Sequence, residues 1–224
     1  MTHLTSAGRL IFAGRAVRSF AFGWLSVILA LYLGERGFSA AAIGAVFTAT
    51  MVEDALLTMG LAGLASRIGP ARVMAATAPL IVLGGALLAT AESPWLLVAG
   101  AVLGTISPNG LEAGPFAPME QALLPDEVRS GSTVRAFGWY NVFAFLPAAL
   151  GAGSAGAALG LALRAGIAEE AAERAMLAGY ALAGVVLTLL YVRLARARPP
   201  APRASPRGRG GFGLGPSRGA VWQL

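Results

Sequence analysis

The 224-residue chain has no cysteine, no lysine and a single histidine, His3, and only 12% of its residues are charged. The absence of cysteine excludes a disulfide framework, thiolate catalysis and Cys-ligated metal. One histidine excludes a metal site of clustered histidines and disfavours a histidine-based catalytic triad. In soluble domains roughly a quarter of the residues are charged. Such low charge argues against a soluble enzyme. It also argues against a disordered chain, because disorder needs many charged and few hydrophobic residues.

Hydrophobic residues make up 56% of the chain and gather in six apolar segments. Crossing a hydrocarbon core of ~30 Å takes ~20 helical residues, and each segment is close to that length. The segments are 16–33, 40–65, 73–91, 95–111, a stretch within 136–163, and 175–192. An alternating β-barrel pattern is absent, and backbone groups in lipid must bond to one another. The sequence therefore predicts an all-α polytopic membrane protein with six transmembrane helices.

The formal net charge of +6 comes from the end of the chain, because residues 1–195 hold equal numbers of arginines and acids. Residues 196–224 are rich in arginine, proline and glycine, which predicts a disordered tail. Either its arginines are attracted to anionic lipid headgroups, or it is a linker or a stray reading-frame extension, which we favour. A folded basic face interleaved with aromatic residues is absent, so nucleic acid is not an expected partner.

The arginines also predict the orientation, because cytoplasmic loops carry an excess of positive charge. Fourteen of them fall on one side of the predicted spans: Arg9, Arg15, Arg18, Arg67, Arg72, Arg129, Arg135, Arg193, Arg196, Arg198, Arg203, Arg207, Arg209 and Arg218. Only Arg36, Arg164 and Arg174 fall on the other. We therefore expect a cytoplasmic N-terminus (1–14), a six-helix transmembrane domain (15–195) and a cytoplasmic tail (196–224). Arginine without lysine is typical of GC-rich bacterial coding, so the expected location is a bacterial plasma membrane.

The loop after the second segment carries a recognisable motif. Residues 62–71 read AGLASRIGPA, and they stand where the major facilitator superfamily of transporters has GxLADRxGRR. The matching positions are Leu64, Ala65, Arg67 and Gly69. Ser66 replaces the acid, and Arg72 partly restores the lost positive charge. Together with GFSAAAIG at the preceding outer turn, GTISPNGLEAGPFAPMEQ (104–121) and RAFGWYN (135–141), the motif makes residues 15–195 resemble the N-terminal six-helix half of such a transporter.

This resemblance implies secondary transport of a small solute by alternating access, with a substrate site near the bilayer midplane between two six-helix halves. It implies no enzyme activity, no metal and no cofactor. It assigns Arg67, Gly69 and Arg72 to locking the inward face, although the missing acid at Ser66 weakens that role. The expected partners are the substrate, the lipid bilayer, and a second six-helix half or a second copy.

Because the chain supplies one half, we expect a truncated or half-length transporter. The abrupt change of composition after Arg198 favours truncation. The alternative is a degenerate membrane protein that does not transport, or a half that needs a partner. An intramembrane enzyme is disfavoured, since the sequence has no HExxH, no paired catalytic aspartates and no Ser/His constellation. The sequence has no Walker motif, so transport driven by ATP hydrolysis is not expected.

Glu53 and Asp54 are the candidate proton or substrate residues. Glu53 lies 13 residues from both Ala40 and Ser66, ~20 Å from each end of its helix and so near mid-bilayer. A carboxylate there costs several kcal/mol unless it is neutralised. Adjacent residues point ~100° apart, so one acid at most faces the substrate path, and the resemblance favours Asp54. That acid binds a proton or a cationic group of the substrate, or it makes a helix–helix hydrogen bond.

Other polar residues near the spans are weaker candidates for the pathway. Asn109 follows Pro108, which frees a backbone carbonyl; this break either lines a cavity or ends the fourth helix. Glu112 lies ~26 Å from the start of that helix, close to water. Asn141 is expected to face the bundle.

Two features near the cytoplasmic side have simpler interpretations. Glu120 is expected to pair with Arg129 or Arg135, as a gate latch or as a surface ion pair. Trp139 and Tyr140 read as an interfacial aromatic belt.

Overall fold

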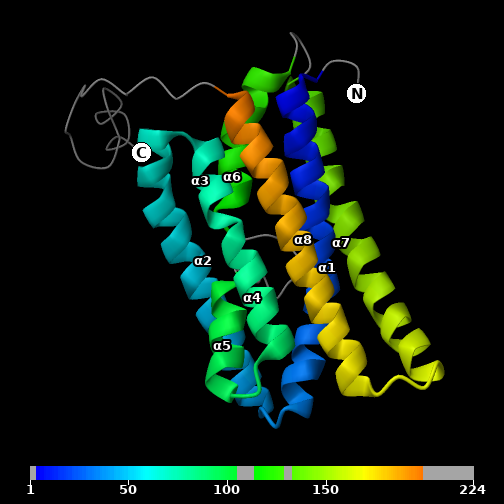
Figure 1. Ribbon diagram of the computed structural model, residues 1–224. Coiled ribbons are helices and arrows are strands. Elements are labelled where there is room, and N and C mark those ends of the chain that lie inside the picture. Colours follow the sequence, from blue (N-terminus) through cyan, green and yellow to red (C-terminus); the bar gives the residue numbers. More distant parts are fainter. Residues whose placement is uncertain (1–3, 105–113, 129–132, 199–224) are drawn as a thin grey trace, which may run out of the picture.

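The computed structural model describes residues 4–104, 114–128 and 133–198. Within these residues the secondary structure is eight α-helices and one short 3₁₀ helix. The elements are α1 (Ser6–Glu35), α2 (Ala40–Ile68), α3 (Pro70–Thr77), α4 (Pro79–Thr90), α5 (Pro94–Leu103), α6 (Phe116–Leu123), η1 (Leu124–Glu127), α7 (Thr133–Arg164) and α8 (Glu169–Ala197). The long helices run alongside one another as one bundle (Figure 1). The predicted all-α class is confirmed.

Five stretches are long and apolar enough to cross a membrane: α1, α2, α3 with α4 (Pro70–Thr90), α7 and α8. They match five of the six predicted segments. The third is two helices because Pro79 has no N–H to continue the ladder, although Ala78 still donates to Met74 O at 2.9 Å. The fourth segment begins as α5, which has ten residues and is too short to span alone. Residues 105–113, where Asn109 and Glu112 fall, lie outside the described part.

Residues 114–128 contain three prolines, Pro115, Pro118 and Pro125, yet they form α6 and η1. Phe116, Met119, Glu120 and Leu123 are buried on one side of α6, at the i, i+3, i+4, i+7 spacing of an amphipathic helix. The region therefore packs into the bundle, and α6 lies against α3.

α1 is the central helix of the bundle. It has sixteen buried residues spread over its length and packs against both α7 and α8, while α8 also packs against α4. α2 and α7 lie at opposite edges of the bundle in Figure 1. Each buries only one narrow stripe; the three buried residues of α2 are Val46, Thr50 and Asp54. Among the five membrane-length stretches, α2 and α7 are consequently the least buried, at 17% and 22% of their most apolar window.

The contact between α1 and α7 is a backbone-to-backbone approach at two glycines. A Cβ placed on Gly23 would lie 2.0 Å from Ala148 O, and one on Gly151 would lie 2.2 Å from Phe20 O. By contrast, a Cβ on Gly153 or Gly156, on the same helix as Gly151, would meet no atom within 4 Å. Close approach at small residues is how helices associate in lipid, and here it fixes α7 on α1.

The end of the bundle where α8 begins is tied together by arginine–glutamate pairs. Arg36 lies 2.7 Å from Glu170, and Arg174 lies 3.0 Å from the same carboxylate. α8 begins at Glu169 with a cluster of acids, Glu169, Glu170 and Glu173. Glu173, however, is only 1% exposed, so the first turn of α8 is partly a packing surface.

Candidate functional site

Glu53 and Asp54 lie in the middle of α2, on two different faces. Asp54 follows Val46 and Thr50 at four-residue intervals, so it belongs to the stripe that faces the bundle. It is 1% exposed. Glu53, about 100° around the helix, is half-buried at the margin of that stripe. The sequence predicts that only one acid of the pair faces inward, and in the structure that acid is Asp54.

The Asp54 carboxylate has no hydrogen-bond partner among the described residues. Its Oδ1 lies against Gly114, where a Cβ would be only 3.2 Å away. Thr50, one turn earlier, directs its hydroxyl to Phe47 O of its own helix at 2.8 Å. Burial of an unpaired carboxylate in apolar surroundings is strongly unfavourable. The site therefore demands a proton or another cation.

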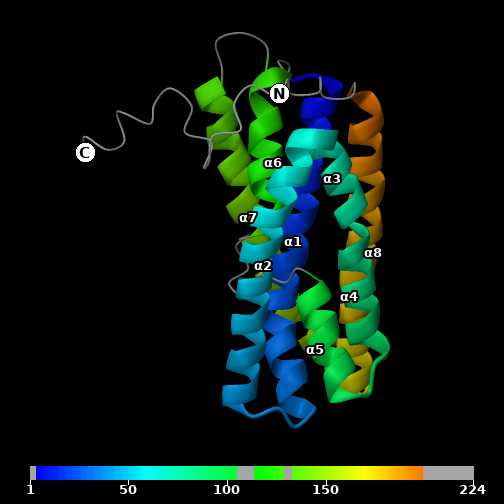
Figure 2. The same cartoon turned by 90° about the vertical axis from the view of Figure 1, so that its left-hand side faces the viewer.

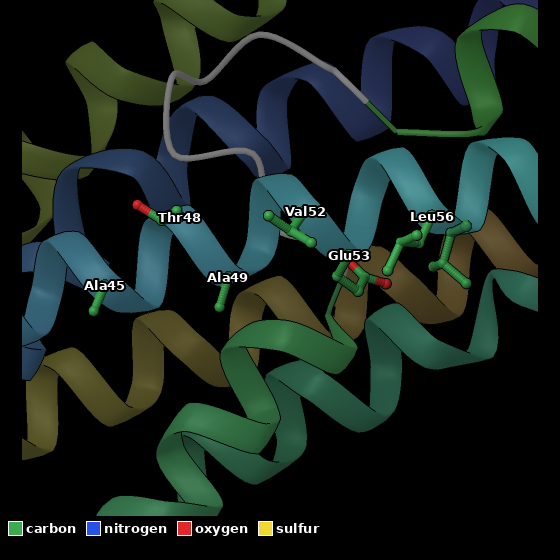
Figure 3. Close-up of a pocket in the computed structure, with 7 residues that line it drawn as sticks. Ala45, Thr48, Ala49, Val52, Glu53 and Leu56 are labelled. Atoms are coloured by element: carbon green, nitrogen blue, oxygen red, sulfur yellow. The ribbon is translucent and has the colours of Figure 1, made fainter.

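Two further oxygens near Asp54 are buried without a partner within the described part: Glu53 Oε2 and Thr58 Oγ1. Glu53 also opens onto a groove along α2, lined by Ala45, Thr48, Ala49, Val52, Glu53, Leu56 and Leu57. Figure 3 shows these side chains along the helix, with Glu53 between Val52 and Leu56. Apart from Thr48, the groove has apolar walls and one acid, so it suits a solute with an apolar body and a positive group.

A second polar cluster, buried between α1, α6, α7 and α8, surrounds Glu120. Arg18 donates from both terminal nitrogens to its carboxylate, at 2.9 and 2.7 Å. The hydroxyls of Tyr140 and Tyr191 donate to the same carboxylate at 2.7 and 2.8 Å. Arg18 and Glu120 have fully buried side chains, and Arg18 also donates to Tyr191 and lies over the Phe116 ring at 5.1 Å. The pair is charge-neutral, and with the two tyrosine hydroxyls it links four helices.

This cluster corrects two sequence-based expectations. Glu120 pairs with Arg18, not with Arg135, and Arg129 lies outside the described residues. Tyr140 is 1% exposed, whereas Trp139 is 52% exposed, so only Trp139 fits an interfacial belt. The missed signal was Arg18 inside the first apolar segment, since a buried arginine needs an acid. The acid is Glu120, which lies among the apolar residues on the buried side of α6.

The remaining predicted residues are surface residues or fall outside the described part. Asn141 is exposed, although it was expected to face the bundle. The buried stripe of α7 runs through Tyr140 and Ala144, and Asn141 is one residue, about 100°, away. Asn109 and Glu112 belong to residues 105–113, so their positions are not described.

The cytoplasmic loop motif forms a sharp connection. Gly69 has φ +94°, a conformation that favours glycine, and it ends α2 while α3 begins at Pro70. Arg67 and Arg72 are exposed and form no ion pair among the described residues. Ser66, in place of the motif's acid, donates to Gly63 O of its own helix at 2.8 Å. The locking role assigned by resemblance therefore stays a prediction.

The long apolar helices, the central α1 and the open faces of α2 and α7 define a multi-pass helical membrane protein. Its fold is similar to part of two solved transporter structures. The chain is similar to a crystal structure of an auto-inhibited POT family peptide transporter, with TM-score 0.64 and 15% identity. It is also similar to the in meso crystal structure of the POT family transporter PepTSo, with TM-score 0.65 and 16% identity.

These matches cover 90% and 89% of this chain but only 39% of each transporter, so the chain spans well under half of their length. The resemblance to the superfamily is thus confirmed as a partial fold. No protein-family model matches the sequence, and no curated protein matches it.

Proposed function

We propose that the chain is part of a secondary transporter that moves a small solute by alternating access, with Asp54 as its central ionisable group. The observation that carries the proposal is a carboxylate that is 1% exposed and without a hydrogen-bond partner among the described residues. It lies midway along a membrane-length helix. Ionisable residues inside the membrane are functional-site candidates because their burial is costly, and transporters use them in proton relays.

In this proposal the bundle has six crossings. α5 and α6 lie one beyond the other along the bundle in both views (Figures 1 and 2), which supports α5 and α6 as parts of one fourth crossing. The approach of Gly114 to Asp54 places the start of α6 beside the candidate site.

We assign different roles to the two acids of α2. Asp54 faces the bundle and takes the coupling proton, while Glu53 faces the groove and attracts a positively charged group of the solute. Asn109, Glu112 and Asn141 remain proposed pathway residues. The loop residues Arg67, Gly69 and Arg72 remain the proposed inward-face lock.

A complete substrate site requires a second six-helix unit against the open faces of α2 and α7. In major facilitator transporters the two halves are related by an axis along the membrane normal, and the site lies between them. Glu53 and Asn141 both lie on surfaces that such a unit would cover. The unit is either a second half or a second copy of this chain.

Replacing Asp54 with asparagine is expected to lower proton-coupled uptake by at least about tenfold, because the amide cannot take up a proton at neutral pH. Glu53→Gln is expected to weaken solute binding while proton coupling persists. The measurement is uptake into proteoliposomes containing a pH-sensitive dye, with a panel of small cationic and zwitterionic solutes that includes dipeptides. The matched control is Glu169→Gln, an exposed acid that should leave uptake unchanged.

Unchanged coupling in Asp54→Asn, together with unchanged solute binding in Glu53→Gln, would show that the pair has no role in transport. If the unaltered chain takes up nothing in the panel, with or without a co-reconstituted second half, the degenerate non-transporting alternative is favoured. The first outcome tests the two acids alone, and the second tests whether the chain transports at all.

The proposed orientation, with both termini in the cytoplasm of a bacterium, gives a separate prediction. Because the chain has no cysteine, a single introduced thiol reports its own location. Ser93→Cys, between α4 and α5, is expected to react with a membrane-impermeant maleimide added to intact cells. Ser66→Cys, near the end of α2, should react only after the membrane is opened. The reverse pattern would contradict the orientation derived from the arginines.

A further inference from the structure

An open groove runs between α3 and α8 at the end of the bundle where α8 finishes. It is lined by Arg72, Ala75, Ala76, Val192, Ala195, Arg196 and Arg198. The two helices pack side by side, and Figure 2 shows α3 and the last turns of α8 at the same end of the bundle. The lining consists only of arginines and small or branched apolar residues.

These residues are ordered along the groove. α3 runs away from this end of the bundle and α8 runs toward it, so Arg72 and Arg196 lie at the mouth. Ala76 is ~6 Å deeper along α3, and Val192 is ~6 Å deeper along α8, at 1.5 Å per helical residue. The groove therefore changes from positive to apolar over about one helical turn, in the direction of the bilayer interior. A phospholipid has the same order, from phosphate to acyl chain.

Two of the three arginines have their charge available. Arg72 and Arg196 are exposed, and neither has an ion pair or side-chain hydrogen bond within the described part of the chain. Arg198 differs, because its guanidinium lies 2.9 Å from both Asp126 and Glu127. Arg198 is thus held in place by its two ion pairs, while the guanidinium groups of Arg72 and Arg196 can bind an anion. Guanidinium groups bind phosphate through paired, charge-assisted hydrogen bonds.

We propose that this groove binds an anionic phospholipid, with its phosphate held between Arg72 and Arg196 and an acyl chain lying against Ala76 and Val192. The apolar walls favour a lipid over a soluble anion, since a free phosphate would contact only the mouth. Basic pockets between transmembrane helices are known to bind anionic headgroups. The site goes beyond the proposed transport function and does not depend on it.

The test uses the full chain, purified in detergent and titrated with phosphatidylglycerol or phosphatidylcholine, with bound lipid counted by native mass spectrometry. The chain is expected to retain phosphatidylglycerol in preference to phosphatidylcholine. Arg72→Gln and Arg196→Gln are each expected to weaken phosphatidylglycerol binding roughly fivefold, the effect of one arginine near an anionic surface. Ala76→Trp fills the apolar part of the groove and should abolish the preference without changing any charge.

The matched control is Arg193→Gln, which removes an exposed arginine one turn before Arg196 on α8, outside the groove. It should bind phosphatidylglycerol as the unaltered chain does. All four substitutions are at surface residues, and a melting curve checks the fold of each variant.

Three results would overturn the proposal. Equal loss in Arg193→Gln would indicate general attraction of the basic end to anionic lipid. Equal binding of phosphatidylcholine would remove the role of charge. Displacement of the lipid by millimolar inorganic phosphate or glycerol 3-phosphate would identify a site for a soluble anion.

Discussion

Glu120→Ala is expected to lower the free energy of unfolding by about 3–5 kcal/mol, because it leaves Arg18 as a buried charge without its carboxylate. The reason is geometric: both side chains are fully buried, and the carboxylate accepts two bonds from Arg18 and one from each of Tyr140 and Tyr191. The measurement is unfolding in mixed micelles of increasing denaturing-detergent fraction, followed by circular dichroism and tryptophan fluorescence.

The control for this prediction removes both charges together. Arg18→Met with Glu120→Leu leaves no buried ion, and replacement of a buried pair by apolar residues of similar size is often neutral or stabilising. The double variant is expected to recover most of the loss. What it does not recover measures the two tyrosine hydroxyls, each of which loses its acceptor at a cost of about 1–3 kcal/mol. A loss below about 1 kcal/mol in Glu120→Ala would mean that Arg18 reaches water or another acid.

The position of this ion pair shows which features the sequence could reveal. Arg18 and Glu120 are separated by 102 positions, and their pairing depends on α6 packing into the bundle. Closeness in sequence predicted Arg129 or Arg135 as the partner of Glu120. Arg18 was used only as one of the arginines that predict the cytoplasmic side. A charged residue within an apolar segment indicates that it has a partner of opposite charge, because an unpaired charge is too costly there. It does not indicate which helix supplies that partner.

The apolar spans were predictable for the opposite reason. Their signal is the length of a run, which depends on bilayer thickness alone, and five of the predicted runs are membrane-length helices. The site was partly predictable. Helical geometry required Glu53 and Asp54 to face different directions, and the spacing predicted both near the middle of their helix, where they lie in α2. Burial of Asp54 depends on which face of α2 meets the bundle, and that is decided by contacts with distant helices.

The second large effect is expected at the contact between α1 and α7. Gly151→Ala and Gly23→Ala should each lower the free energy of unfolding by about 3 kcal/mol, at the upper end of the usual cost of overpacking. The new methyl group at Gly151 would lie 2.2 Å from Phe20 O, and that at Gly23 would lie 2.0 Å from Ala148 O. Both obstacles are backbone atoms, which cannot move aside as a flexible side chain does. Relief requires α7 to separate from the central helix, and unfolding in mixed micelles would measure the loss.

Gly153→Ala and Gly156→Ala supply the matched controls, because they make the same change on α7, the helix of Gly151, at positions where a Cβ meets nothing within 4 Å. They are expected to be neutral or to stabilise α7 by up to about 1 kcal/mol, the helix preference of alanine over glycine. Equal losses in all four variants would show that glycine is required for flexibility of the helices, and the proposed close contact would be wrong. Loss at Gly151 and Gly23 alone would support the close backbone contact between α1 and α7, which leaves the open face of α7 free for the proposed second unit.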